Sequence, residues 1–340
     1  MIEVKDLVKR YGSRNAVDHL SFTVEDGQIF GFLGPNGAGK STTMNIITGY
    51  LAATEGDVII EGHNILEEPE EAKRCIGYLP ELPPLYPDMT VLEYLRFAAE
   101  LKKLPKAHRE DQISQAMALT HLEDMSQRLI RNLSKGYRQR VGLAQAILGF
   151  PKIIILDEPT VGLDPKQVVE IRELIRHLAR EHTVIISSHI LSEIRAVCDH
   201  VLIIRKGRFV ACDTPEHLEE QLSANDQMEL LAKGSRDAAE DVLLTAGGIR
   251  SHTVTEQTDS AVRMTLTTDG DRREALFRAF AAADVPLLEM RPRMASLEDV
   301  FLDLTDDDDE VAARAARLLK NEPSAEAEGR EEARHHDGNL

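Results

Sequence analysis

The chain has 340 residues, of which 58 are acidic and 40 are basic, and its formal net charge is −18. This length is sufficient for two domains, and the acidic balance disfavours a protein that coats nucleic acid, although it leaves room for a local basic face. No apolar run approaches the roughly 18 residues of a membrane span, and the N-terminus lacks the apolar core of a signal peptide. We therefore expect a cytoplasmic protein that works at a membrane only through a partner.

Up to about residue 214, short β-branched runs alternate with helical stretches. Residues 1–27 alternate apolar and polar side chains around turns, which is typical of an antiparallel meander. The later runs "KIIILDEP", "HTVIISSH" and "HVLIIRKG" are almost continuously apolar, as in strands buried on both faces of a sheet. Between these regions, residues 81–130 contain two helical segments and a proline-broken loop. The pattern predicts an α/β domain over residues 1–218, with an antiparallel edge and a helical insert over about 81–130.

From Met228 the pattern changes to a β-α-β-β-α-β order, which predicts a small α+β domain of the ferredoxin-like type over residues 225–305. This domain would close with a helix that begins at Ser296. Residues 306–340 are densely charged and have few large apolar side chains, so we expect a disordered acidic tail.

The segment "GPNGAGKST" follows a strand-like run and precedes a helical one, and it fits the pattern G-x-x-x-x-G-K-[ST]. Glycines allow backbone N–H groups to curl around phosphate oxygens, and the following helix contributes its positive end. In such a loop Lys40 would reach the β- and γ-phosphates and the Ser41 hydroxyl would ligate Mg²⁺. The predicted phosphate-binding residues are Gly34, Pro35, Asn36, Gly37, Ala38, Gly39, Lys40, Ser41 and Thr42.

Two further strands carry polar side chains to their carboxyl ends, where open α/β sheets bind ligands. Asp157 and Glu158 end one strand, and His189 follows the next. One carboxylate would hold the metal through water, and Glu158 would polarise the attacking water or act as general base. His189 would lie near the γ-phosphate. Three strand ends that converge on one place indicate a chain that hydrolyses a nucleoside triphosphate.

The segment "LSKGYRQR", residues 133–140, is compatible with a helix start, a basic patch or half of a binding site. Ser134 is a suitable N-cap, and Gly136 would let the backbone approach a ligand closely. A helix start of this kind presents free N–H groups and a positive dipole end, so it is also an anion site.

Taken together, these motifs resemble those of the ATP-binding subunit of an ABC transporter, a P-loop NTPase cassette. "GPNGAGKST" resembles its Walker A loop, "IIILDEP" the Walker B strand, "VGLDP" the D-loop with Asp164, and His189 the switch histidine. Tyr11 matches the aromatic residue that stacks on adenine. The segments "LSKGYRQRVGLAQAILG", "PPLYPDMTVLEYLRFAAELK" and "SLEDVFLDLT" are similar to those of ABC-2-type exporter ATPases such as the gliding-motility ATPase.

The resemblance implies a head-to-tail dimer that sandwiches two ATP molecules with Mg²⁺. Each ATP would meet the phosphate loop of one copy and the signature residues of the other copy, which are Ser134, Lys135, Gly136 and Tyr137. The implied metal-binding residues are Ser41, Asp157 and Glu81. Glu81 stands where the family usually has glutamine, and Val161 stands where the D-loop often has serine.

The expected function is thus ATP hydrolysis that powers a separately encoded ABC-2-type permease, from the inner face of the cell membrane and in the direction of export. The second ATPase subunit would be identical or related, and the C-terminal domain could instead sense a small regulator. The alternative is a soluble ABC ATPase that acts on nucleic acid or ribosomes. The single cassette, the acidic balance and the lack of sustained heptads disfavour this alternative.

Overall fold

The computed structural model describes residues 1–222, 227–258 and 260–292. The chain divides into two compact units between Pro215 and Glu216, and each unit is described by itself below. The closing helix predicted to begin at Ser296 and the tail predicted over residues 306–340 lie outside the described residues.

The main sheet of the first unit has six strands in the order β10-β9-β3-β8-β7-β6. Strand β10 is antiparallel to β9, and the other neighbouring strands are parallel. The carboxyl ends of β3, β8 and β7, which are adjacent, therefore lie along one edge. The strands are β3 (Ile29–Leu33), β6 (Ile76–Leu79), β7 (Ile153–Asp157), β8 (Thr183–Ser188), β9 (His200–Arg205) and β10 (Arg208–Asp213).

A second, antiparallel sheet has the order β2-β1-β4-β5. Its strands are β1 (Ile2–Tyr11), β2 (Arg14–Val24), β4 (Glu55–Ile60) and β5 (His63–Asn64). The two sheets share one apolar core, in which Phe22 of β2 stacks on Phe30 with ring centroids 5.8 Å apart. The predicted α/β arrangement with antiparallel strands at one side is confirmed.

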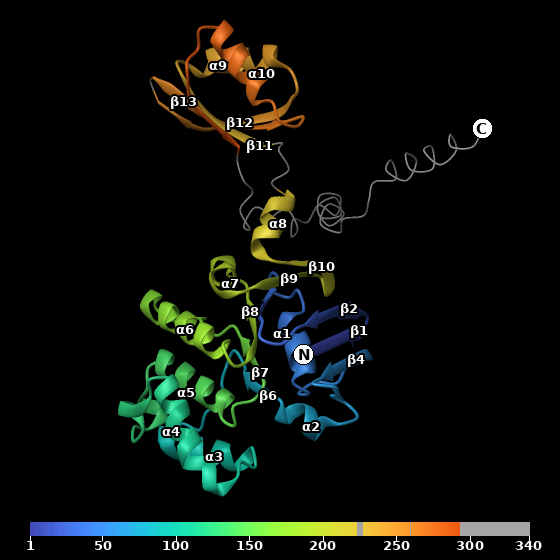
Figure 1. Ribbon diagram of the computed structural model, residues 1–340, viewed down its shortest axis with the longest axis vertical. Helices are drawn as coiled ribbons and strands as arrows, with labels where there is room; N and C mark the ends of the chain where they lie inside the picture. Colours follow the sequence, from blue (N-terminus) through green and yellow to red (C-terminus); the bar gives the residue numbers. More distant parts are fainter. Residues whose placement is uncertain (223–226, 259, 293–340) are drawn as a thin grey trace, which may run out of the picture. The chain divides into compact units, whose positions relative to one another are not determined.

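Helices α3, α4 and α5 form a group at one end of the first unit, apart from the antiparallel sheet (Figure 1). Helix α5 lies beyond the predicted insert, and it packs against α3 and α4 as well as against β6. The helices of residues 1–222 are α1 (Lys40–Ile47), α2 (Pro69–Arg74), α3 (Val91–Leu101), α4 (Arg109–Leu119), α5 (Lys135–Ile147), α6 (Pro165–Leu178), α7 (Leu191–Val197) and α8 (Pro215–Leu222). Short 3₁₀ turns span Lys106–His108, Glu123–Met125 and Ile130–Asn132.

The second unit has the element order β-α-β-β-α-β, with all neighbouring strands antiparallel in the order β12-β13-β11-β14. Its elements are β11 (Gln227–Lys233), α9 (Arg236–Ala246), β12 (Ile249–Gln257), β13 (Ala261–Thr268), α10 (Arg273–Ala282) and β14 (Leu287–Pro292). Every second residue of β13 is buried, as expected for a sheet with helices on one face. Its core includes Leu230, Val242, Met264, Leu266 and Phe280.

Candidate functional site

The phosphate loop connects the end of β3 to the start of α1. Gly39 stands at the N-cap of α1 with a φ of 109°, and Gly37 also has a positive φ of 81°. These conformations require glycine, and a Cβ on Gly39 would lie 2.5 Å from the carbonyl oxygen of Ala16. No side chain caps the first turn of α1 among the described residues, so its N–H groups are available to an anion.

Lys40 is buried and bends back over its own loop. Its ammonium donates to the carbonyl oxygens of Gly34, at 2.7 Å, and Pro35, at 3.4 Å. Ala38 closes the turn by donating its N–H to the Pro35 oxygen. Burial lowers the pKa of Lys40, and the nearby carboxylates, of which Glu158 is the strongest, oppose that shift.

Asp157 ends β7 opposite the start of α1. The Ser41 hydroxyl lies 3.5 Å from Asp157 Oδ1, and the Ser187 hydroxyl of β8 donates to the same oxygen. A hydroxyl and a carboxylate held in this way are oxygen donors of the kind that Mg²⁺ prefers. Within the described residues no group of three or more His, Cys, Asp or Glu side chains is placed to hold a metal ion.

Glu158 follows Asp157 in a left-handed backbone conformation, with a φ of 49°, which is uncommon for a residue other than glycine. Its N–H donates to the carbonyl oxygen of Ser187. Its carboxylate lies 3.8 Å from Lys40 Nζ and accepts a 2.9 Å hydrogen bond from Nδ1 of His189. Burial raises the pKa of Glu158, while His189 and Lys40 act in the opposite direction.

These groups border a cavity of about 500 Å³. The residues that line it are Tyr11, Arg14, Ala16, Asn36, Gly37, Gly39, Lys40, Ser41, Thr42, Glu81, Glu158, Val161 and His189. The structure thus brings together the phosphate loop, the acidic strand end and the histidine that the sequence singled out. Gly34, Pro35 and Ala38 complete the loop behind Lys40.

Tyr11 and Arg14 flank the turn between β1 and β2, at the outer side of this cavity. Tyr11 is 53% exposed, and the Lys9 ammonium lies 5.4 Å from its ring centroid. The sequence singled out Tyr11 but missed Arg14 and Ala16. Their position three and five residues after Tyr11 in the same hairpin is the signal that could have indicated them.

The signature segment starts α5, and none of the described residues Ser134–Tyr137 lines the cavity. Ser134 is the N-cap, and its Oγ accepts a hydrogen bond from the N–H of Tyr137. The predicted cap is therefore present. This helix start therefore does not contribute to the nucleotide cavity of its own copy.

The D-loop lies beside the signature segment of the same chain. Asp164 caps α6 by accepting from the N–H of Gln167 at 3.0 Å, and the Gln167 side chain covers Gly136. A Cβ on Gly136 would lie 2.5 Å from Gln167 Oε1, and one on Gly162 would lie 2.0 Å from the Lys135 ammonium. The expected positive charge of Lys135 thus rests over its own D-loop in this structure.

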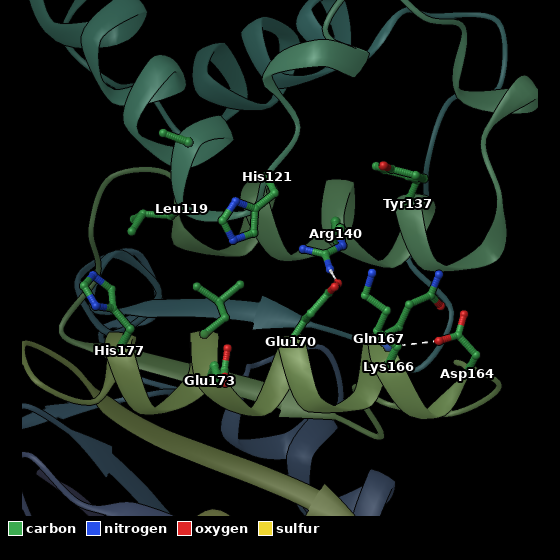
Figure 2. Close-up of a pocket in the computed structure, with 12 residues that line it drawn as sticks. Leu119, His121, Tyr137, Arg140, Asp164, Lys166, Gln167, Glu170, Glu173 and His177 are labelled. Carbon is green, nitrogen blue, oxygen red and sulfur yellow. Dashed lines mark hydrogen bonds and ion pairs between the residues drawn. The ribbon is translucent and has the colours of Figure 1, made fainter.

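A larger cleft of about 890 Å³ separates α4 and α5 from α6. Figure 2 shows Arg140 of α5 and Glu170 of α6 pointing toward one another across it. Their side chains form an ion pair, and Arg140 also donates to the carbonyl oxygen of Thr120 at 3.1 Å. The buried Arg140 side chain therefore joins α5 to α6 and to the end of α4.

Residues 17–161 match the protein family described as "ABC transporter". The ABC transporter ATP-binding protein YhcH of Bacillus subtilis is 33% identical over 322 residues, which cover 93% of this chain and 99% of the relative. The chain belongs to the ATP-binding proteins of ABC transporters. The bacitracin transport ATP-binding protein BcrA of Bacillus licheniformis is 35% identical over 306 residues, with 89% of this chain and 97% of that protein covered.

The ATP-binding cassette MJ0796, solved as a dimer bound to ADP and Pi, is 26% identical to this chain and has a TM-score of 0.58. The match covers 63% of this chain and 98% of that cassette. The resemblance inferred from the motifs is confirmed, and with it the cassette fold. The chain is an ATP-binding subunit of an ABC transporter, in a family whose members hydrolyse ATP.

ABC transporter ATPases dimerise and work with membrane permeases. Over the described part of this cassette chain, no helix is both long enough and apolar enough to cross a membrane.

Proposed function

We propose that this ATP-binding subunit hydrolyses ATP in the cavity between the phosphate loop and the ends of β7 and β8, and so powers a separately encoded permease of the ABC-2 type. The observation that carries the proposal is the convergence of Lys40, Glu158 and His189 on one cavity whose other wall is the start of α1. The Lys40 ammonium, the Glu158 carboxylate and the His189 ring can all reach the terminal phosphate of a nucleotide placed in this cavity.

The phosphate loop binds the triphosphate. Its left-handed glycines and the open first turn of α1 present N–H groups to the phosphate oxygens. The Lys40 ammonium, now bonded to Gly34 and Pro35, turns toward the β- and γ-phosphates when they arrive. The partly exposed ring of Tyr11 is the stacking surface for adenine, and Arg14 extends that wall.

Glu158 and His189 act at the γ-phosphate. Glu158 orients a water molecule and accepts its proton as the oxygen attacks phosphorus and the bond to the β-phosphate oxygen breaks. Burial favours this role because it raises the pKa of the Glu158 carboxyl, which makes the carboxylate a better proton acceptor than an exposed glutamate. His189, bonded to that carboxylate, contacts the γ-phosphate oxygen.

Mg²⁺ supplies charge neutralisation to the phosphates when it is bound. Ser41 would be its direct ligand, and Asp157 would hold it through water, in keeping with the 3.5 Å distance between their oxygens. Glu81 lines the same cavity in place of the usual glutamine, and it would approach Mg²⁺ only through water while adding negative charge near the phosphates.

The active form is a head-to-tail dimer. The signature residues Ser134–Tyr137 do not line the cavity of their own copy, although Ser134 caps a helix start that is suited to an anion. In the dimer this helix start meets the γ-phosphate bound to the other copy, and Asp164 and its loop lie next to it. The second copy is identical or a related ATPase.

The ATP-binding domain spans residues 1–218, so it includes the first unit and the three residues after Pro215, and its helical part near 81–130 faces the permease. Residues 225–305 form a ferredoxin-like accessory domain, a proposal supported by the order β12-β13-β11-β14 of the antiparallel sheet within residues 227–292. Residues 306–340, which lie outside the described residues, are the proposed acidic tail. The chain works at the inner face of the cell membrane, held there by the permease.

Export is the proposed direction of transport. The relatives include proteins named for bacitracin transport and for linearmycin resistance. Action on nucleic acid or ribosomes is not favoured, since YhcH and BcrA, which match about nine tenths of the chain, are transporter ATP-binding proteins.

ATP turnover by the purified full-length chain tests the site. Lys40→Ala is expected to abolish ATP binding or turnover, and Glu158→Gln to bind ATP while losing at least about 100-fold in turnover. Glu67→Gln, an exposed carboxylate outside the cavity, is the matched control and is expected to keep the parental rate. If Glu158→Gln hydrolysed ATP at the parental rate, Glu158 would not be the proton acceptor.

A further inference from the structure

Glu193, in α7, is an acidic side chain that is 9% exposed and does not line the nucleotide cavity. Its Oε2 accepts hydrogen bonds from the hydroxyls of Thr160 and Ser188, the latter at 3.2 Å. Both hydroxyl residues are themselves buried. A buried carboxylate needs such donors because it has lost its water, so the three side chains form one polar unit inside an apolar region.

The two donors come from the two segments that carry the reacting groups. Thr160 lies two residues after Glu158, in the turn that leads to the D-loop. Ser188 is the last residue of β8 and directly precedes His189, and its hydroxyl also accepts from the N–H of Ile190 at 3.0 Å. Glu193 therefore ties the turn after Glu158 to the turn that carries His189.

These turns need support from their surroundings. Glu158 has a φ of 49°, a conformation that costs energy in a glutamate unless neighbouring contacts enforce it. On the N-terminal side of Glu158, the Ser187 hydroxyl holds the chain through its hydrogen bonds to Asp157 and to the N–H of Glu158. On the C-terminal side, Glu193 holds the chain through its hydrogen bond from Thr160.

From this geometry we propose that Glu193 is a positioning residue for ATP hydrolysis. It holds the turn of Glu158 and the turn of His189 at a fixed separation, and thereby keeps the 2.9 Å hydrogen bond between these two side chains aligned with the γ-phosphate and its attacking water. This inference rests on the proposed roles of Glu158 and His189. It adds to the site a residue that lies outside the nucleotide cavity.

The test compares steady-state ATP turnover, the KM for ATP and the melting temperature of full-length variants. Glu193→Ala removes both acceptor contacts, and Glu193→Gln keeps an acceptor oxygen of the same reach. Thr160→Val removes one donor at nearly constant shape, and Thr160→Ser keeps it. Val197→Ala is the matched control, because it removes buried atoms from the same helix and leaves both hydrogen bonds of Glu193 in place.

We expect Glu193→Ala to lower kcat by about 10- to 100-fold with the KM for ATP changed by no more than about threefold, since misplaced reacting groups cost rate rather than binding. Thr160→Val should show a smaller loss of the same kind, and the conservative variants Glu193→Gln and Thr160→Ser should recover most of the rate. The double variant Glu193→Ala/Thr160→Val should be no slower than Glu193→Ala, because both changes break one unit.

A merely structural role makes a different prediction. In that case Glu193→Ala would lose melting temperature as Val197→Ala does and would keep kcat, which overturns the inference. If Glu193→Ala does not fold, Thr160→Val decides the question. A lower kcat with a nearly unchanged KM in that variant supports the inference, and an unchanged kcat overturns it. Glu158→Gln is assayed in parallel. If it retains parental turnover, the proposed function itself fails. If it is inactive while Glu193→Ala and Thr160→Val match Val197→Ala, only the positioning role is wrong.

Discussion

Nδ1 of His189 lies 2.9 Å from Oε2 of Glu158, although the two residues follow the ends of different strands and are 31 positions apart in the chain. The pair exists because β7 and β8 are parallel neighbours, so their carboxyl ends meet at one edge of the sheet. Both side chains line the cavity, and His189 is 41% exposed whereas Glu158 is 7% exposed. The contact links the titration of Glu158 to the presence of His189.

The first prediction concerns pH. Burial raises the pKa of Glu158 above its ordinary value of 4.5, and the hydrogen bond from His189 partly lowers it. The carboxylate is the active form, so turnover should fall on acidification with a midpoint above pH 4.5. His189→Ala removes the lowering contact, so the midpoint of its residual turnover should move to higher pH. A midpoint that stays in place or moves down, measured from kcat against pH, would contradict this coupling.

The second prediction concerns Glu81, which stands in the cavity where relatives of this type usually have glutamine. Its negative charge helps to keep Lys40 protonated and repels the triphosphate. Glu81→Gln should therefore tighten binding of MgATP by about 2- to 10-fold, an effect that diminishes at high salt. Equilibrium titration with a fluorescent ATP analogue measures it, with Glu67→Gln as the control. Weaker binding by Glu81→Gln would show that the carboxylate is needed as a metal ligand.

The third prediction concerns Gly136. A methyl group there would meet Gln167 Oε1 at 2.5 Å, and Gln167 would have to move. Gly136→Ala should raise the free energy of unfolding by less than the ~1 kcal/mol that alanine gains over glycine in a helix, because the end of the Gln167 side chain must swing away, and Gln167→Ala in the same chain should restore the remainder. Urea denaturation of the single and double variants checks the coupling. Equal effects of Gly136→Ala with and without Gln167 would mean that the two side chains do not share this space.

The fourth prediction concerns the ion pair between Arg140 and Glu170. Arg140 is 8% exposed at its side chain, so removal of its partner leaves a nearly buried charge. Glu170→Ala should lower the free energy of unfolding by about 1–3 kcal/mol, less than a fully buried pair because Glu170 is 37% exposed. The control is Glu110→Ala, which breaks an exposed pair with Arg96 and should change stability by no more than about 1 kcal/mol. Similar losses in the free energy of unfolding in both variants would mean that the Arg140 guanidinium is solvated, which contradicts its burial.

Much of the cassette follows from local patterns in the sequence. The phosphate loop, Asp157, Glu158 and His189 could be placed because each follows an apolar run that predicts a buried strand, and parallel strands end at one edge. Ser134 and its helix start were also predictable, because a cap is a local feature. The β-α-β-β-α-β order of residues 227–292 was readable from alternating and helical periods.

Other relationships depend on how distant elements pack, and no local pattern carries them. Gln167 covers Gly136 only because α6 lies against the start of α5. No motif in the sequence marks Glu193, and only the packing of α7 brings it into contact with Thr160 and Ser188. Arg14 is a polar residue in a turn, and only the position of the β1–β2 hairpin over the phosphate loop brings it into the cavity. The signature segment is the opposite case, since its motif is clear in the sequence but the phosphate that we propose it contacts is bound to another copy.

We propose that each ATP site is completed by the signature segment of a second copy. Sedimentation of Glu158→Gln, with saturating ATP or ADP, distinguishes such a shared site from a site within one chain. We expect a dimer with ATP and a monomer with ADP, and we expect that adding Gly136→Asp leaves ATP binding intact but keeps the chain monomeric. A Glu158→Gln chain that binds ATP and stays monomeric, or a Gly136→Asp double variant that dimerises equally well, would contradict it.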